Sequence, residues 1–201
     1  LILVFSIPLG IFTARHAGGR MDKALTSVNQ VLMAIPAFVT GILLTYVFGL
    51  VLRLFVPGNY VSPGDNFGAS LWYFLFPAVS IALPRVAMTV KMLRSSILSE
   101  LQKDYVRTSH SRGNSDRATL YRHVLRNAMG PVVSFLAMTV ADIVAGSVVI
   151  EQVFSLPGLG RMLLTSIANR DYPVVQAVVV IVAFWVVLVN LLADLINRSE
   201  E

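Results

Sequence analysis

The sequence contains no cysteine and few charged residues. The lack of cysteine excludes disulfides and thiolate metal sites. Charged residues make up 13% of the chain, whereas a soluble domain usually carries about 25%. Hydrophobic residues make up 56% of the 201 positions, more than the core of so small a domain can bury. Because a bilayer can accept that apolar surface, the composition indicates an integral membrane protein.

Catalytic motifs are absent as well. The sequence has no G-x-x-x-x-G-K-[ST] stretch, so any ATP hydrolysis would take place on another chain. The three histidines, His16, His110 and His123, lie outside the apolar segments. No paired carboxylates or histidines converge inside those segments, which argues against an enzyme. The lack of converging histidines or carboxylates inside the apolar segments also argues mildly against a free metal ion as substrate, although not against a chelate.

Five apolar segments follow one another along the chain. They cover residues 1–13, 24–51, 71–90, 129–150 and 173–196. The last four reach the length of about 20 residues that a spanning helix needs. Strands are excluded because they leave backbone groups unpaired in lipid unless they close a barrel, and barrel strands alternate in polarity. The sequence therefore predicts an all-α membrane domain over residues 1–196 with five spans, and a short cytoplasmic tail over residues 197–201.

The basic residues favour one side of the predicted spans. Twelve of the sixteen lysines and arginines follow the first, third or fifth span, and eight of these fall within residues 91–128. The opposite segments hold Arg53, Arg161 and Arg170. Because short loops rich in Lys and Arg stay in the cytoplasm, we expect residues 91–128 to form a cytoplasmic loop. The chain would then start outside and end inside.

This loop has the pattern of two amphipathic helices. Apolar residues recur at helical spacing over residues 97–106 and again over residues 120–128. Between them Gly113 suits the left-handed position that ends a helix, and Asn114 or Ser115 can cap the next helix. The pattern predicts a helix–turn–helix whose tip docks on a partner. A helical hairpin that lies on the membrane without a partner is the alternative.

Several sequence motifs, spread over nearly the whole chain, are informative as a set. In the loop they are Tyr105-Val-Arg-Thr-Ser-His-Ser-Arg-Gly113 and Tyr121-Arg-His-Val-Leu-Arg-Asn-Ala128, followed by Pro131. Elsewhere they are Phe76-Pro77-Ala78 to Arg94-Ser95-Ser96, Glu151-Gln-Val-Phe-Ser-Leu-Pro-Gly-Leu-Gly160, Asn169-Arg-Asp-Tyr-Pro-Val-Val175 and Val189-Asn-Leu-Leu-Ala-Asp194. Together they resemble the permeases of binding-protein-dependent ABC importers, and more narrowly the dipeptide, oligopeptide and nickel branch. Because that family typically has six spans, the first span is expected to be absent from this sequence.

The resemblance implies a division of labour among several chains. Two permeases, identical or homologous, would pair in the membrane, each docked to a cytoplasmic ATPase that binds ATP and Mg²⁺. An external solute-binding protein would deliver the solute. The ATPase would contact the loop tip, whose candidate residues are Thr108, Ser109, Arg112, Gly113, Asn114, Ser115, Asp116 and Arg117.

A polar, broken segment over residues 153–172 corresponds to the external segment of that family. Its Pro157, Gly158 and Gly160 predict a turn, and residues 162–168 a short surface helix. In the family this segment would gate the cavity or meet the binding protein, and the candidate residues are Glu151, Pro157, Gly158, Gly160, Arg170 and Asp171.

Two ionisable residues fall within the apolar segments, Arg85 in the third and Asp142 midway along the fourth. Charges at this depth usually face the interior of a bundle or a water-filled cavity. We therefore expect both residues to line the translocation pathway. The alternative is an Arg85–Asp142 pair that only holds two helices together.

The function that follows by resemblance is import of di- or oligopeptides across the inner membrane of a prokaryote by alternating access. Nickel or a chelated metal is the alternative solute. From a different class, a helical channel or a membrane assembly protein would need no ATPase. A channel should show a sustained polar stripe, whereas the spans hold isolated polar residues such as Thr40, Thr89 and Thr139.

Overall fold

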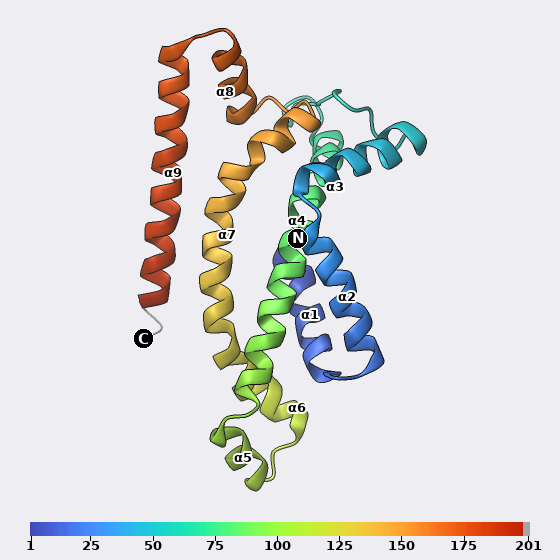
Figure 1. The fold of residues 1–201 in the computed structure, drawn as a ribbon, viewed down its shortest axis with the longest axis vertical. Coiled ribbons are helices and arrows are strands. Elements are labelled where there is room, and N and C mark those ends of the chain that lie inside the picture. The colour runs from blue at the N-terminus through green and yellow to red at the C-terminus, as the bar shows by residue number, and fades with distance from the viewer. Residues whose placement is uncertain (199–201) are drawn as a thin grey trace.

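The computed structural model in Figure 1 is an elongated assembly of helices. It describes residues 1–198, apart from the side chains of residues 141, 145, 193, 194 and 196–198, so residues 199–201 of the expected tail lie outside the described residues. Within residues 1–198 all regular elements are helices, which confirms the all-α prediction. They are α1 (Ile2–Arg15), α2 (Arg20–Ala34), α3 (Ala37–Leu44), α4 (Phe67–Glu100), α5 (Asp104–Ser111), α6 (Asp116–Thr119), α7 (Leu125–Val153), α8 (Leu159–Ala168) and α9 (Tyr172–Arg198), with π-helical turns at Thr45–Val51 and Leu120–Val124.

Helix α4 is the central element. It packs against α1, α2, α3 and α7, and α7 in turn packs against α8 and α9. Helices α5 and α6 lie at the lower end of Figure 1 and α8 lies at the upper end. We call the lower end the α5 end and the upper end the α8 end. The loop tip and the segment around α8 are thus at opposite ends of the molecule.

Within residues 1–198, three helical stretches are long and apolar enough to cross a bilayer: Phe67–Glu100, Asp116–Val144 and Tyr172–Leu192. A fourth span results if Arg20–Ala34 and Ala37–Val51 count as one. Helix α1 is apolar but has 14 residues, about 21 Å at the α-helical rise, and a hydrocarbon core is about 30 Å thick. The structure therefore gives three or four spans, and five spans stay a prediction.

The second apolar segment, predicted as one span over residues 24–51, is interrupted at Pro36. It breaks between α2 and α3, which are bent by 96°. Ile35 has an extended backbone (φ −87°, ψ 120°) and Pro36 caps α3. Proline disfavours the helical conformation in the residue before it, which accounts for the break. By contrast, α1 and α4 continue through Pro8, Pro77 and Pro84.

The boundaries of the loop helices also differ from the prediction. The expected separate helix over residues 97–106 is wrong, because α4 runs unbroken to Glu100 and α5 starts only at Asp104. No glycine or proline interrupts residues 91–100, and the buried Leu93 and Ile97 continue the packed face of α4. The expected helix over residues 120–128 likewise merges into α7. Helices α4 and α7 therefore extend into the predicted loop, and the loop tip is held between the short helices α5 and α6.

Two hydrophobic clusters organise the packing. At the α5 end, side chains from α1, α4, α5, α7 and the turn before α7 are buried together: Ile11, Ala14, Leu93, Ile97, Val106, Leu120, Val124, Ala128 and Val132. Gly10 allows α1 to approach α4 closely, since a Cβ there would lie 2.8 Å from Leu93. At the α8 end the second cluster is Phe55, Tyr73, Phe76, Ile150, Phe154 and Leu156. The loop tip is thus anchored on a packed base that includes α1 and α4.

Candidate functional site

The turn after α5 has the backbone that the sequence predicted for Gly113. Its φ is +81°, in the left-handed region. The Gly113 N–H donates to the His110 carbonyl at 2.9 Å, and the Asn114 N–H donates to the Ser109 carbonyl at 3.3 Å. These two bonds form a Schellman motif, which satisfies the last carbonyls of α5. The side chain of Ser115 then accepts the Ala118 N–H at 3.3 Å and caps α6. Positive φ at Gly113 and a cap at Ser115 are both confirmed.

Side-chain hydrogen bonds inside the loop hold this turn. The hydroxyls of Ser109 and Thr119 lie 2.9 Å apart and are both buried. Asn114 Nδ2 donates to Ser109 Oγ at 3.1 Å. Of the eight predicted contact residues, Ser109 alone is buried, so its side chain braces the turn from inside. The other seven are exposed at the tip and include Thr108, Arg112, Asp116 and Arg117.

The junction of α4 and α5 is fixed by a carboxylate. Lys103 Nζ lies 2.6 Å from Glu100 Oε1, and Tyr105 Oη donates to Glu100 Oε2 at 2.8 Å. The hydrogen bond to Glu100 raises the pKa of Lys103 above its ordinary value, and burial raises the pKa of Tyr105. Glu100 therefore ties the end of α4 to the start of α5.

An ion pair that the sequence did not predict lies near the same end. Arg94 of α4 donates from Nε and Nη2 to the two carboxylate oxygens of Asp22, each at 2.8 Å. Asp22 also accepts the Gly18 N–H at 2.9 Å, and its side chain is only 5% exposed. This bidentate pair, which we call the Asp22 clamp, fastens the α1–α2 turn to α4. The signal in the sequence was a single carboxylate in a segment that is otherwise basic.

The structure brings Arg85 and Asp142 together. Arg85 Nη1 lies 3.1 Å from Asp142 Oδ2, across the seam between α4 and α7. The Asp142 side chain is 62% exposed, whereas the Asp22 carboxylate is buried. Because the Asp142 side of the pair is exposed, the pair can hold α4 and α7 together and also face a cavity. The role of the pair in a translocation pathway stays a prediction.

At the α8 end, Glu151 of α7 reaches the start of α8. Its Oε2 accepts the Arg161 N–H at 3.0 Å, and Ser147 Oγ donates to its Oε1 at 3.3 Å. A carboxylate at a helix N-terminus is stabilised by the helix dipole. Gly158 leaves space for this carboxylate, which a Cβ would overlap. Glu151 and Gly158 thus fit each other. The predicted turn at Pro157 and Gly158 precedes α8, but α8 starts at Leu159, so Gly160 lies inside the helix and not in the turn.

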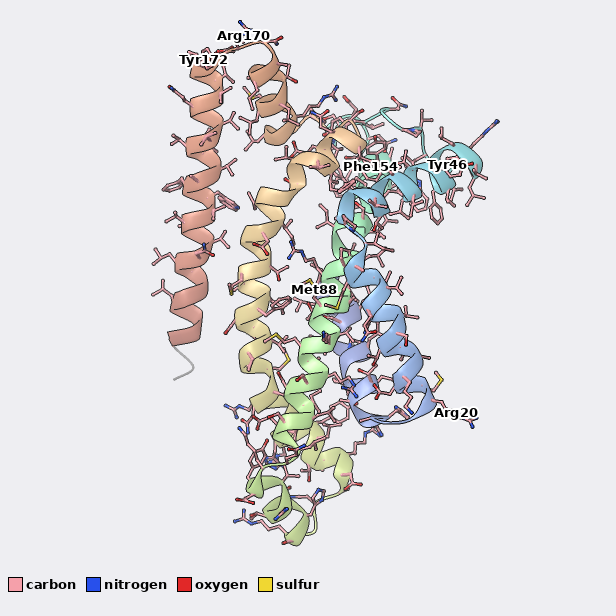
Figure 2. All side chains as sticks on the ribbon, viewed as in Figure 1. Arg20, Tyr46, Met88, Phe154, Arg170 and Tyr172 are labelled. Carbon is pink, nitrogen blue, oxygen red and sulfur yellow. The ribbon has the colours of Figure 1, made fainter. Side chains whose placement is uncertain are left out.

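The remaining predicted residues of this end lie at its surface. Arg170 is exposed with φ +57°, and Asp171 Oδ1 accepts the Val174 N–H at 3.4 Å near the start of α9. Figure 2 shows Arg170 and Tyr172 at the upper extremity of the molecule. Arg161, which the sequence did not single out, donates from Nη1 to the Ser155 carbonyl at 2.9 Å. Exposure leaves Pro157, Arg170 and Asp171 free to meet a partner.

The close approach of α8 to α7 gives a stability prediction. A Cβ at Gly160 would lie 2.5 Å from Val148 Cα, a backbone atom that cannot turn away. We expect Gly160→Ala to cost about 1–3 kcal/mol, the usual range for overpacking, and to lower the thermal unfolding midpoint in detergent. The control is Gly146→Ala on α7, where a Cβ meets nothing within 4 Å. Equal midpoints for the two variants would show that α8 does not need this contact.

These features define a class of protein: an all-α chain with helices long and apolar enough to cross a membrane, which carries a compact helix–turn–helix at one end. The chain belongs to the family of binding-protein-dependent transport system inner membrane components, whose model matches residues 6–199.

Three curated relatives show which members of the family the chain is similar to. A probable peptide ABC transporter permease protein, y4tP of Sinorhizobium fredii, is 34% identical over 97% of this chain and 62% of its own length. The oligopeptide transport system permease protein AppB of Bacillus subtilis is 34% identical over 98% of this chain and 63% of its own. The nickel import system permease protein NikB of Staphylococcus aureus is 33% identical over 98% of this chain and 56% of its own length.

The chain therefore spans less than two thirds of the length of these relatives. The peptide and nickel relatives match it at nearly the same identity. The branch of the family is thereby identified, and the identities do not separate the two kinds of solute.

Proposed function

We propose that this chain is a permease subunit of an ATP-driven importer, and that it moves di- or oligopeptides across the inner membrane by alternating access. Residues 1–196 would form the transmembrane domain, with the α5 end in the cytoplasm and the α8 end outside. The observation that carries the proposal is the braced turn at Gly113, because a stiff exposed turn on a packed base can transmit movement.

The coupling step would run through that base. An ATPase would hold the exposed tip residues in a groove, and its closure would displace α5. The buried cluster that joins α5 to α1, α4 and α7 would pass the displacement to the spans, since packed interiors transmit strain with little compression. The Asp22 clamp adds the α1–α2 turn to the same moving block.

The pathway would pass the Arg85–Asp142 pair. An exposed ion pair at this depth is favourable in a water-filled cavity and costly against lipid. At the α8 end, Glu151 would fix α8 as an external gate, and Pro157, Arg170 and Asp171 would meet the binding protein. Gly158 and Gly160 would let α8 pack closely when the gate is shut.

The proposal assigns the remaining parts to other chains. A second permease would complete the cavity, and separate ATPases would bind ATP and Mg²⁺ and carry out the hydrolysis, so this chain would not itself be an enzyme. An external protein would capture the solute. Import of nickel or a chelated metal is the second candidate, because a permease named for nickel import is 33% identical to this chain. A channel or assembly factor of another class would work without ATPase or binding protein.

Reconstitution tests the proposal directly. The full-length permease is purified in mild detergent with its co-purifying ATPase and binding protein and placed in liposomes. We expect peptides to stimulate ATP hydrolysis and to accumulate inside. Stimulation by nickel alone would favour the second candidate, and transport without ATP hydrolysis would contradict an importer.

The proposed orientation gives a prediction of its own. Single cysteines at positions 64, 113 and 158 can be introduced because the chain has none. In intact cells an impermeant thiol reagent should label positions 64 and 158 and leave position 113 unlabelled until the cells are opened, following the distribution of Lys and Arg. Labelling of position 113 but not position 64 in intact cells would reverse the orientation.

A further inference from the structure

A hollow of about 320 Å³ lies on α4 between α2 and α7. Its lining includes three methionines and a phenylalanine, with a lysine and serines beside them: Met33, Met88, Met92, Phe135, Lys91 and Ser95. Met33 comes from α2, Phe135 from α7 and the others from α4, which forms the floor. Met88 is labelled midway along α4 in Figure 2. We call this space the methionine hollow.

The methionine hollow and the Arg85–Asp142 pair share one seam. On α4, Arg85, Met88 and Met92 are three and four residues apart, so they lie on the same helical face. On α7, Phe135 and Asp142 are seven residues apart, two turns along one face. Since Arg85 and Asp142 bond across that seam at 3.1 Å, the pair lies about two turns from Met92, further toward the α8 end.

The chemistry of the lining suits a variable apolar group. Methionine is unbranched, polarisable and flexible, so methionines from two helices can adapt to side chains of different shape. Phe135 adds a flat apolar wall and a sulfur–aromatic contact surface. The hollow is large enough for one amino-acid side chain and does not demand a single shape.

The charges near the hollow suit a zwitterion and oppose a bare cation. Lys91 is exposed in the lining of the hollow. Arg85 lies outside the lining, on the face of α4 that carries Met88 and Met92. Two cationic side chains attract a carboxylate, and Asp142 offers a partner for an ammonium group. Among the residues that the structure describes, no three His, Asp or Glu side chains come together as a metal site. A small peptide, with two charged ends and variable side chains, matches this arrangement.

We infer that the methionine hollow is a side-chain subsite on the translocation path, which takes an apolar side chain of a zwitterionic peptide while Arg85, Asp142 and Lys91 face its charged ends. The inference rests on the proposed function and names its substrate class. It selects peptides over nickel ions through residues of this chain, in addition to any selection by a binding protein.

The test compares two peptides presented by the same binding protein to the reconstituted importer. Met88→Ser should reduce uptake of leucyl-leucine about tenfold, as expected when a hydrophobic pocket loses its fit, and should leave uptake of glycyl-glycine nearly unchanged. The matched control is Met21→Ser, the same change on α2 at a methionine that is 58% exposed and outside the hollow. It should leave both peptides unaffected. Equal losses of the two peptides in Met88→Ser would overturn the subsite.

A second measurement does not depend on transport. In the otherwise cysteine-free importer, Met88→Cys should react with a small hydrophilic thiol reagent, and leucyl-leucine should slow this reaction more than glycyl-glycine or Ni²⁺. Slowing by Ni²⁺ alone would overturn the inference. A wild-type importer that takes up nickel and no peptide would instead overturn the proposed function itself, which keeps the two failures distinct.

Discussion

Replacing Gly113 by valine is expected to remove most of the association between this permease and its ATPase, and uptake with it, while the spans still insert. The reason is conformational: Gly113 has φ +81°, and an L-residue in the left-handed region costs about 1–2 kcal/mol, with more for a β-branched side chain. A Cβ at Gly113 would meet nothing within 4 Å, so the energetic cost of the substitution comes from the backbone conformation and not from a steric clash. A penalty near 1.4 kcal/mol corresponds to about a tenfold loss of the docked state. Co-purification and substrate-stimulated ATP hydrolysis in liposomes measure both effects.

Gly58→Val is the matched control for this change. Gly58 has φ +83°, and a Cβ there would make only ordinary contacts, at 3.8 Å or more. It lies in the segment between α3 and α4, near the α8 end, so it carries similar backbone strain away from the loop tip. We expect Gly58→Val to retain the ATPase. If Gly113→Val keeps wild-type association and stimulation, the turn merely separates two interfacial helices, and the coupling role is refuted.

Breaking the Asp22 clamp is expected to have the largest effect on stability. Asp22→Asn keeps the shape but removes the charge that Arg94 contacts through two hydrogen bonds of 2.8 Å. Asp22 is 5% exposed and Arg94 28%, so the substitution leaves a partly buried guanidinium without its carboxylate and should cost about 3 kcal/mol, the lower end of the range for buried pairs. The thermal unfolding midpoint of the detergent-purified permease should fall clearly, and coupling should weaken because the α1–α2 turn is released from α4.

Asp142→Asn is the same substitution at an open pair and serves as the comparison. The Asp142 side chain is 62% exposed, and exposed ion pairs contribute at most about 1 kcal/mol. We therefore expect nearly unchanged stability and insertion, with altered peptide uptake. If Asp142→Asn destabilises the permease as much as Asp22→Asn does, the carboxylate is not facing water, and its place on a pathway is wrong.

Local chemistry made part of the candidate site predictable. The left-handed Gly113, the cap at Ser115 and the turn at Gly158 each depend on residues adjacent in sequence, so a short stretch decided them. The pairing of Arg85 with Asp142 was one of two alternatives, because two opposite charges in apolar segments have few other partners. Asp22 was missed, since its partner Arg94 lies 72 residues away and either residue alone looks like part of a polar loop.

By itself the sequence determined that this is an all-α membrane protein, because its composition and long apolar segments exclude other folds in lipid. It also determined the turns at Gly113 and Gly158, through glycine and capping residues. Only the tertiary structure decided how far α4 and α7 extend into the loop, because burial of Leu93, Ile97 and Val124 against α1 and α5 outweighed local signals for separate helices. It likewise decided the Asp22 clamp and the methionine hollow. Each of these depends on where distant residues meet in space, and that is set by the packing of whole helices rather than by any one segment.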